Sequence, residues 1–483
     1  MCFCTNSQVF LCENRKMHTG FHLNYVMNFY FYFAKLCSHL LFRPICGTVT
    51  IQIYSGYFVP ARSVTSVSKH TAGPPACPAD LKYSNRIQVI ETFLSGGVYS
   101  ANDISASIGL SRQTVMKSIQ FFLRSGLLVS AGKGDSTNLG GKRPELFTLS
   151  QEKYFLCITL WPQELRLHLF TIGKQLTDLI SLTTPLPGDP RAAIDNVGQL
   201  AGRLLEKHRI PPDNLCAVSL STAGTVDYKT GRLKYSSQSP GWGTDIPLVS
   251  YLQPYFSPHT MIFLENAGKM TARPFLLEKD LVHKRVLVIF ACWGLSSCLI
   301  EKGHILSGKN SLIGEIGHMI IDPKDPEKCG CGSHGCLERL VSVERVRTVL
   351  HRQAAQFPQS RLLQIPLEQV GIGDVFTASG GGDPLARSLV EYLARAFAAA
   401  LRNICLVFDP DLIVFQGDYA YADGHFDRQL RSSLQEFQYF PSEGPFEIRY
   451  DRRPLAEMDA LGSYTALIRR YFATPALYQE PEA

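Results

Sequence analysis

The stretch GEIGHMIIDPKDPEKCGCGSHGCLE, residues 314–338, contains three cysteines within eight residues and one histidine upstream of them. The histidine is His318, and Cys329, Cys331 and Cys336 follow with the spacing Cys-x-Cys-x4-Cys. Four soft ligands are the number that zinc takes in a tetrahedral site with no open position. Glycines between the cysteines allow a loop tight enough to bring the sulfurs together. The stretch therefore predicts a structural zinc ion, Zn2+.

Two other uses of these cysteines fit the sequence less well. Free buried thiols would not need three cysteines in so short a loop, and redox chemistry usually employs a Cys-x-x-Cys pair, which the loop lacks. A closed site also has no position for a catalytic water, so the metal is expected to hold the fold together rather than to react. The chain has 14 cysteines, without the spacing of a small disulfide framework, which favours a reducing cytoplasm.

The charge of the chain is unevenly distributed. The 483 residues are 45% hydrophobic and 19% charged, which is typical of a globular protein with two or three domains. The formal net charge is +6. Residues 81–150 hold eight Lys or Arg against four Asp or Glu, and they combine this basic balance with a regular hydrophobic pattern. Any contact with nucleic acid is therefore expected in this segment.

The first eighty residues differ from the rest of the chain. They contain few acidic residues, six cysteines and an aromatic run, YVMNFYFYF, at residues 25–33. Polar residues follow closely, so no apolar span of about 18 residues is left for a membrane helix, and the pattern of a signal peptide is missing. We expect residues 1–80 to be an unstructured extension or the product of a mis-assigned start codon, with a membrane-attached regulator as the alternative.

Residues 81–149 predict a winged helix-turn-helix domain. Two helices are expected around a turn at Gly109, with Ser100 or Asn102 capping the first and Ser111 the second. Two short apolar strands between turn residues follow, as in a wing. An ordinary helical hairpin is the alternative, but the wing and the basic balance favour DNA binding. The side chains expected to meet DNA lie at the start of the second helix and on the wing: Arg112, Gln113, Thr114, Lys117, Lys133, Lys142 and Arg143.

Strands and helices alternate from residue 150 to residue 476. Runs such as YFLCITLW, RVLVIFACW and DLIVFQGD are typical of strands buried on both faces. IDNVGQLAGRLLEKH and LARSLVEYLARAFAAALRNICLVF instead have the periodicity of helices. Buried strands joined by long helices predict an α/β protein, here one of two lobes.

These motifs together resemble the ROK family, which groups bacterial sugar kinases with sugar-responsive repressors of the xylose and N-acetylglucosamine kind. Residues 314–338 resemble the zinc signature of the family, and STAGTVDYKTGRLKYSSQSPGW and LENAGKMTARP resemble other family segments in the family's order. GGKRPELFTL resembles the winged helix of the repressor branch. The resemblance extends over residues 85–472.

The resemblance implies an actin-like, two-lobed sugar-kinase fold in residues 150–476, preceded by the winged helix-turn-helix, and a homodimer or homotetramer. It implies that loop 318–336 binds zinc through the histidine and the three cysteines quoted above. It also implies that a sugar binds between the lobes, where carboxylate and amide groups can hydrogen-bond its hydroxyls. The implied sugar ligands are Asn266, Glu315, His318, Glu338 and, where the family commonly has asparagine, Gln238.

The residues that phosphoryl transfer needs are altered. Kinases of the family place an aspartate directly after the asparagine of their END motif, and this chain has Ala267 there. The D-x-G-x-T motif of the first strand is replaced by ITLWPQEL, and the G-T-G-x-G turn by ACWGLSS, which keeps only Gly294. Near the expected adenosine site, Asp418 stands where a second glycine is common. We therefore expect no catalytic residues and no kinase activity.

The sequence thus predicts a sugar-responsive DNA-binding transcriptional regulator of carbohydrate metabolism genes. We expect it to act as a repressor in the cytoplasm, without a membrane partner. Its partners would be operator DNA and a small sugar effector. Sugar binding would close the lobes and change the affinity for the operator. Two alternatives stay open: an ATP-dependent sugar kinase, and a regulator controlled by a protein partner.

Overall fold

The computed structural model describes residues 78–93, 96–134, 143–436 and 446–474. All of these residues belong to one compact unit of the chain. The expectations for residues 1–77 and for Lys142 lie outside the described residues.

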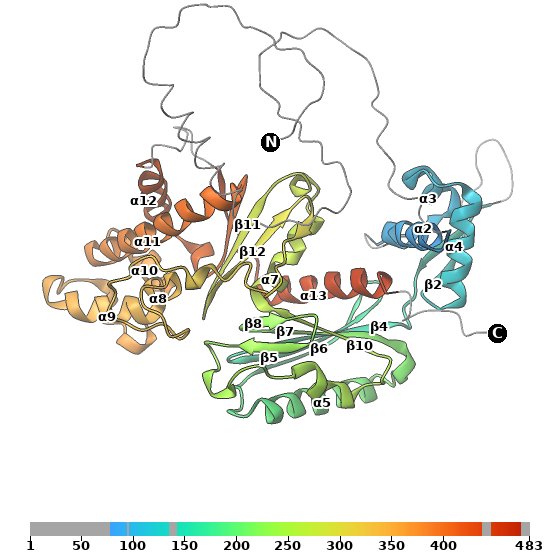
Figure 1. The fold of residues 1–483 in the computed structure, drawn as a ribbon, viewed down its shortest axis with the longest axis horizontal. Helices are drawn as coiled ribbons and strands as arrows, with labels where there is room; N and C mark the ends of the chain where they lie inside the picture. Colours follow the sequence, from blue (N-terminus) through green and yellow to red (C-terminus); the bar gives the residue numbers. More distant parts are fainter. Residues whose placement is uncertain (1–77, 94–95, 135–142, 437–445, 475–483) are drawn as a thin grey trace, which may run out of the picture. The chain divides into compact units, whose positions relative to one another are not determined.

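The N-terminal part of this unit contains three helices and a three-stranded sheet of order β1-β3-β2 (Figure 1). Ser100 caps α3 and forms a capping box with Asp103, and Gly109 ends the helix at a φ of 71°. Ser111 caps α4 by accepting a hydrogen bond from the Thr114 N–H. The elements are α2 (Pro78–Phe93), β1 (Tyr99–Ser100), α3 (Ala101–Ile108), α4 (Arg112–Arg124), β2 (Leu128–Lys133) and β3 (Glu145–Leu149).

The first lobe is built on a five-stranded sheet of order β10-β7-β4-β5-β6. β4 pairs in parallel with β7 and antiparallel to β5. Alternate side chains of β4 pack on opposite faces of the sheet, with Leu156 in the core that contains α5 and Phe155 in the core that contains α13. The elements are β4 (Tyr154–Trp161), β5 (Glu164–Thr171), β6 (Leu176–Thr183), α5 (Pro190–Lys207), β7 (Leu215–Thr222) and β10 (Met261–Asn266).

The second lobe is built on a sheet of order β13-β12-β11-β14-β15. β11 pairs in parallel with β14 and antiparallel to β12. A large core of buried Leu, Val, Phe and Ala joins β11 and β14 to helices α8 to α12. The strands are β11 (Val286–Ala291), β12 (Leu295–Glu301), β13 (His304–Ile305), β14 (Leu412–Gly417) and β15 (Glu447–Tyr450). The helices are α8 (Leu337–Leu340), α9 (Val343–Gln353), α10 (Ile372–Gly380), α11 (Pro384–Phe408) and α12 (Gly424–Gln435).

Helix α13 (Leu455–Phe472) contacts both the first lobe and the N-terminal helices. It covers the face of the first sheet opposite α5 (Figure 1). It also crosses α7 (Ala267–Ala272) so closely that a Cβ at Gly462 would collide with the carbonyl oxygen of Met270. At its C-terminal end the ring of Phe472 lies edge-on to that of Phe122 in α4, with centroids 5.9 Å apart.

Smaller elements connect these parts: β8 (Thr225–Asp227) pairs with β9 (Arg232–Tyr235), and α6 (Leu248–Leu252) follows. None of the helices within the described residues is long and apolar enough to span a membrane. The expected α/β fold class is confirmed by the two sheets and their flanking helices.

Candidate functional site

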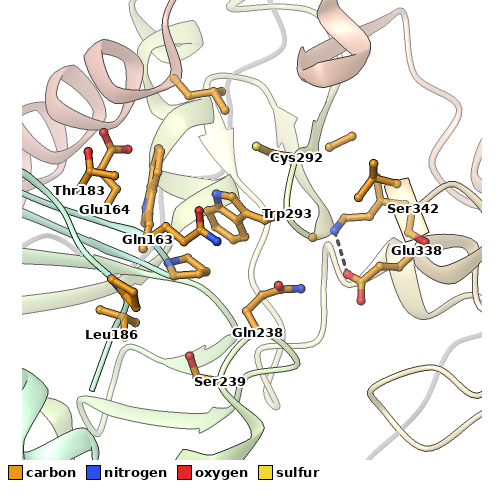
Figure 2. Close-up of a pocket in the computed structure, with 18 of the residues that line it drawn as sticks. Gln163, Glu164, Thr183, Leu186, Gln238, Ser239, Cys292, Trp293, Glu338 and Ser342 are labelled. Atoms are coloured by element: carbon orange, nitrogen blue, oxygen red, sulfur yellow. Dashed lines mark hydrogen bonds between the residues drawn. The ribbon is translucent and has the colours of Figure 1, made fainter. Parts of the chain in front are cut away.

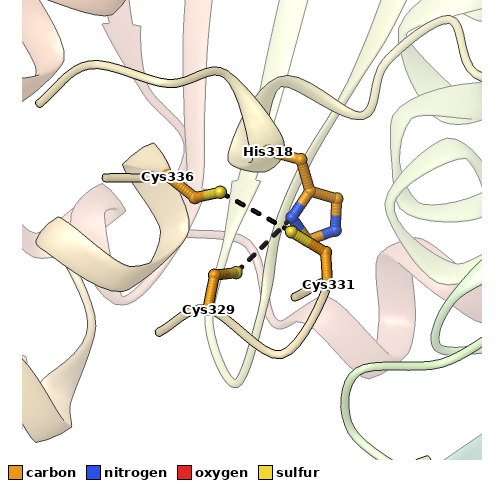
Figure 3. A group of neighbouring side chains, drawn as sticks. All are labelled: His318, Cys329, Cys331 and Cys336. Atoms are coloured by element: carbon orange, nitrogen blue, oxygen red, sulfur yellow. Dashed lines mark hydrogen bonds between the residues drawn. The ribbon is translucent and has the colours of Figure 1, made fainter. Parts of the chain in front are cut away.

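The four predicted metal ligands lie together in the second lobe (Figure 3). Their ligand atoms are all within 4.8 Å of one another. The Cys329 sulfur is 3.7 Å from the Nδ1 atom of His318, and the sulfurs of Cys331 and Cys336 are 3.6 Å apart. Cys329 and Cys336 are buried and Cys331 is exposed, so the cluster lies at the protein surface.

These distances fit a shared metal ion better than a disulfide. A disulfide would place two sulfurs about 2.05 Å apart. Tetrahedral zinc holds each sulfur at about 2.3 Å, which separates two sulfurs by roughly 3.8 Å. The observed 3.6 Å is close to the second value. The residues present therefore suit zinc both in chemistry and in spacing.

The loop that carries the cluster is anchored to its surroundings. The Ile321 N–H donates to the Gly335 carbonyl at 2.7 Å. Gly335 has a φ of 71°, and a Cβ there would collide with the backbone of Asp322, so the turn requires glycine. Arg345 of α9 donates to both carboxylate oxygens of Asp325 at 2.7 Å in a buried pair.

A cleft of about 950 Å3 lies between the two lobes and is bordered at one end by the first turn of α13. Figure 2 shows Gln238 from the first lobe and Glu338 from the second among its lining side chains. The Nε2 atom of Gln238 and the Oε2 atom of Glu338 each lie 3.4 Å from the position that a Cβ would occupy at Gly294. Glycine at this position therefore keeps a polar space open between an amide and a carboxylate.

Glu338 is held in place by the backbone. Its Oε2 atom accepts a hydrogen bond from the Leu295 N–H at 2.8 Å, and its own helix α8 begins directly after Cys336, a predicted metal ligand. Because Cys336 is the N-cap of α8, the geometry of the cysteine loop and the position of this carboxylate are connected through two residues of backbone.

Three other residues expected to contact a sugar are not among those that line this cleft: Asn266, Glu315 and His318. Asn266 instead caps α7, with its Oδ1 accepting from the Lys269 N–H and its Nδ2 donating to the Gly224 carbonyl. Burial raises the pKa of the Glu315 carboxyl, while nearby His318 and Lys269 lower it. The role of these three residues in sugar binding stays a prediction.

Aromatic side chains meet where two hairpins approach each other across the cleft. Trp161 ends β4 and Trp293 lies in the turn after β11, and their ring centroids are 5.6 Å apart. Phe290 packs against Trp293 at 5.1 Å. The sequence indicated only that glycines were missing from these two turns, because nothing in it places the two tryptophans side by side.

The position where the kinases have an aspartate is Ala267, the first residue of α7, and it is buried. In this position the chain offers no proton acceptor. Glu265, two residues before Ala267, is buried and accepts a hydrogen bond from Arg273 at 3.0 Å.

The residues expected to contact DNA lie on the N-terminal helices and strands. Five of the predicted side chains are exposed: Arg112, Gln113, Lys117, Lys133 and Arg143. Thr114 is partly buried, and its N–H donates to the Ser111 hydroxyl of the cap.

The ROK family profile matches residues 181–452, which is more than half of the chain. The chain therefore belongs to the ROK family. The expected family is confirmed by this match.

Its relatives include regulators and kinases. The DNA-binding transcriptional dual regulator NagC of Escherichia coli (strain K12) is 24% identical over 405 residues, which cover 83% of this chain and 95% of that protein. A glucokinase of Halalkalibacterium halodurans is 22% identical over 293 residues, which cover 60% of this chain and 86% of that protein. Among solved structures, a ROK family transcriptional regulator described as a homologue of the E. coli MLC protein has a TM-score of 0.69 at 19% identity, covering 83% of this chain and all of that one. The chain thus shares its fold with a regulator of the family.

Proposed function

We propose that the protein is a DNA-binding transcriptional regulator that responds to a sugar. The observation that carries the proposal is that a ROK body, residues 150–476, is preceded by an N-terminal unit, residues 78–149. Helix α4 of this unit exposes Arg112, Gln113 and Lys117. The match to NagC over 405 residues supports it, because that length exceeds the body and must extend into the N-terminal unit.

The N-terminal unit suits a winged helix-turn-helix. α3 and α4 are joined by a three-residue turn, and β2 and β3 form the hairpin of a wing. In such domains the N-terminal end of the second helix enters the major groove, where arginine reads guanine and lysine binds phosphate. Lys133 and Arg143, which are exposed, would contact the DNA backbone from the wing.

A sugar kinase is the second candidate, because glucokinases are among the relatives. Two features argue against it. Ala267 removes the carboxylate base, whose loss commonly costs about 10²- to 10⁴-fold in rate. Trp161 and Trp293 bring indole rings to the two hairpins where glycine-rich turns would let phosphate groups approach the backbone. An assay with ATP and a panel of hexoses separates the two candidates, since steady formation of sugar phosphate would identify a kinase.

Zinc would be held by His318 Nδ1 and the sulfurs of Cys329, Cys331 and Cys336. Such an ion holds a loop in shape and supplies no catalytic water, since its four positions are taken by protein. Glu338, two residues after the last ligand, and Gln238 opposite it would bind neighbouring hydroxyls of the sugar. A sugar bound between the lobes would favour one arrangement of them, and the operator affinity would change through α13. A protein partner as the controlling ligand is the third candidate.

We expect Arg112→Ala to lower the affinity for operator DNA about 10- to 100-fold, because a direct base contact is worth roughly 1–3 kcal/mol. Lys117→Ala should weaken binding to all DNA sequences by a similar factor. It should also lower the number of ions released on binding by about one, which reduces the salt dependence of the affinity. Fluorescence anisotropy with a duplex selected from random DNA measures both effects. Arg352→Ala, an exposed arginine of α9, is the matched control. Equal losses in the control and in Arg112→Ala would contradict the assignment of α4 as the reading helix.

Glu338→Gln should weaken sugar binding about 10- to 100-fold while the protein stays folded. The amide oxygen can still accept the Leu295 N–H, so the substitution removes the charge and keeps the local bond. Thermal-shift screening with a monosaccharide panel identifies the sugar, and calorimetry then compares the variant with Glu368→Gln, an exposed glutamate outside the cleft. Undiminished affinity in Glu338→Gln would show that this carboxylate does not bind the effector.

A further inference from the structure

A second cavity, of about 210 Å3, is lined by four lysine or arginine side chains and by His304. Lys269 and Arg273 reach it from α7 and the turn that follows, and Arg469 and Arg470 reach it from the last turn of α13. Glu265 is the one carboxylate among its lining residues. The cavity shares no lining residue with the cleft that contains Glu338. That cleft borders the first turn of α13, and the cavity borders the last turn.

The positive charges of this cavity are only partly balanced by nearby carboxylates. Glu265 accepts a hydrogen bond from Arg273 at 3.0 Å, but the described residues provide no hydrogen-bonded carboxylate for Lys269, Arg469 or Arg470. Lys269 is only 7% exposed. The Nε atom of Arg273 is buried and has no hydrogen-bond partner among the described residues. Buried donors without acceptors are costly, so a ligand that accepts hydrogen bonds would stabilise this arrangement.

The guanidinium groups are held in position by aromatic rings. Arg470 lies 3.9 Å from the ring centroid of Phe263 and 5.1 Å from that of Tyr228. Arg273 lies 5.4 Å from the Phe263 ring. Burial lowers the pKa of Arg470, and the neighbouring Arg273 lowers it further, which is the effect expected of like charges held together. The cavity is therefore pre-organised for an anion.

We propose that this cavity binds a tetrahedral oxyanion, either inorganic phosphate or the phosphoryl group of a small phosphate monoester. Arginine forks match phosphate oxygens in pairs, and the buried lysine adds a point charge. The volume of about 210 Å3 accommodates a phosphoryl group with a short substituent but not a nucleotide.

An anion in this cavity would join three parts of the molecule. Tyr228 comes from the first lobe, Ile305 from the second, and Arg469 from α13. Arg469 also interacts electrostatically with Glu91 of α2, in the N-terminal unit. A bound phosphate would compete with Glu91 for this guanidinium and so influence how the N-terminal unit is held.

Isothermal titration of the full chain tests the proposal, with inorganic phosphate and glycerol 3-phosphate as separate probes and sodium chloride at matched ionic strength as the blank. We expect measurable binding of at least one probe, weakened about 10- to 100-fold by Arg470→Gln through the loss of charge-assisted hydrogen bonds. Lys269→Met, which keeps the length of the side chain, should have a similar effect. Arg352→Gln is the arginine control and should bind like the wild type. Tighter binding of one probe distinguishes free phosphate from a monoester.

The absence of binding by both probes would overturn the proposal, as would binding that neither Arg470→Gln nor Lys269→Met weakens. A loss of DNA affinity in the two variants, without phosphate binding in the wild type, would instead assign these side chains to the DNA surface. Circular dichroism of each variant confirms that the comparison is made between folded proteins. None of these outcomes depends on whether a sugar binds between the lobes.

Discussion

Replacing Cys336 with serine should yield protein without bound zinc and with a much lower melting temperature. Cys336 is fully buried, is 3.6 Å from the Cys331 sulfur and is the N-cap of α8. A serine hydroxyl is a poor zinc ligand, so one coordination position and the loop geometry are lost together. We expect a loss of several kcal/mol, a large part of the roughly 5–15 kcal/mol that keeps a domain folded.

The zinc content of the purified protein, measured by atomic emission, is the direct readout of this prediction. Wild-type protein should contain one zinc per chain. Cys405→Ser, at a buried cysteine near the end of α11 and outside the cluster, should retain it even if its stability falls. Because Glu338 follows Cys336 by two residues, the Cys336→Ser protein should also lose sugar affinity. Wild-type protein isolated repeatedly without zinc, in metal-supplemented medium, would refute the metal assignment.

Asp459→Asn should abolish a large pH dependence of stability. Asp459 of α13 is completely buried and accepts hydrogen bonds from Thr159 at 2.5 Å and from Ser221 at 2.6 Å, in two strands of the first sheet. Burial raises the pKa of this carboxyl to about 7, although the two hydroxyl groups lower it. In the unfolded chain the same group titrates near 3.8.

The direction of the effect follows from the two pKa values. Between about pH 4 and pH 7 the folded protein holds a proton that the unfolded chain releases, so stability falls as the pH rises through this window. One pKa unit corresponds to about 1.4 kcal/mol, which makes the total effect about 4 kcal/mol. An asparagine cannot ionise and can still bond to both hydroxyls, so the variant should lack this dependence and should exceed the wild type in stability above pH 7.

Denaturant unfolding at pH 5 and at pH 8 measures the change, with Asp213→Asn as the surface control. The quantity of interest is the change in the free energy of unfolding between pH 5 and pH 8 for Asp459→Asn, minus the same change for the wild type. A value near zero would mean that Asp459 ionises inside the protein without cost.

Local patterns in the sequence predicted several buried strands, and they predicted that one histidine and three cysteines would cluster. The run YFLCITLW coincides with β4 at Tyr154–Trp161, because its residues are buried on both faces and need no alternation. His318, Cys329, Cys331 and Cys336 lie close together because they belong to one short loop, whose geometry depends on glycines that the sequence displays.

Features that depend on contacts between residues far apart in the sequence could not be predicted from it. Helix α13 is buried on nearly all sides, so it lacks the polar face whose periodicity reveals a helix. Strand β6 lies at a sheet edge with mostly exposed side chains, and the apolar residues of its sequence LTDLISLT do not alternate as in a typical strand. The basic cavity combines Lys269 with Arg470, and only the fold brings these residues of two helices together.

The contact between Phe122 and Phe472 has a consequence for the order of synthesis. The N-terminal helices leave the ribosome first, yet the aromatic residues that complete their buried core belong to α13, which is made far later. An incomplete chain would therefore display an uncovered apolar surface next to α4 and would be a target for proteases and chaperones. Only a chain translated through α13 would hold α4 firmly in its packed position.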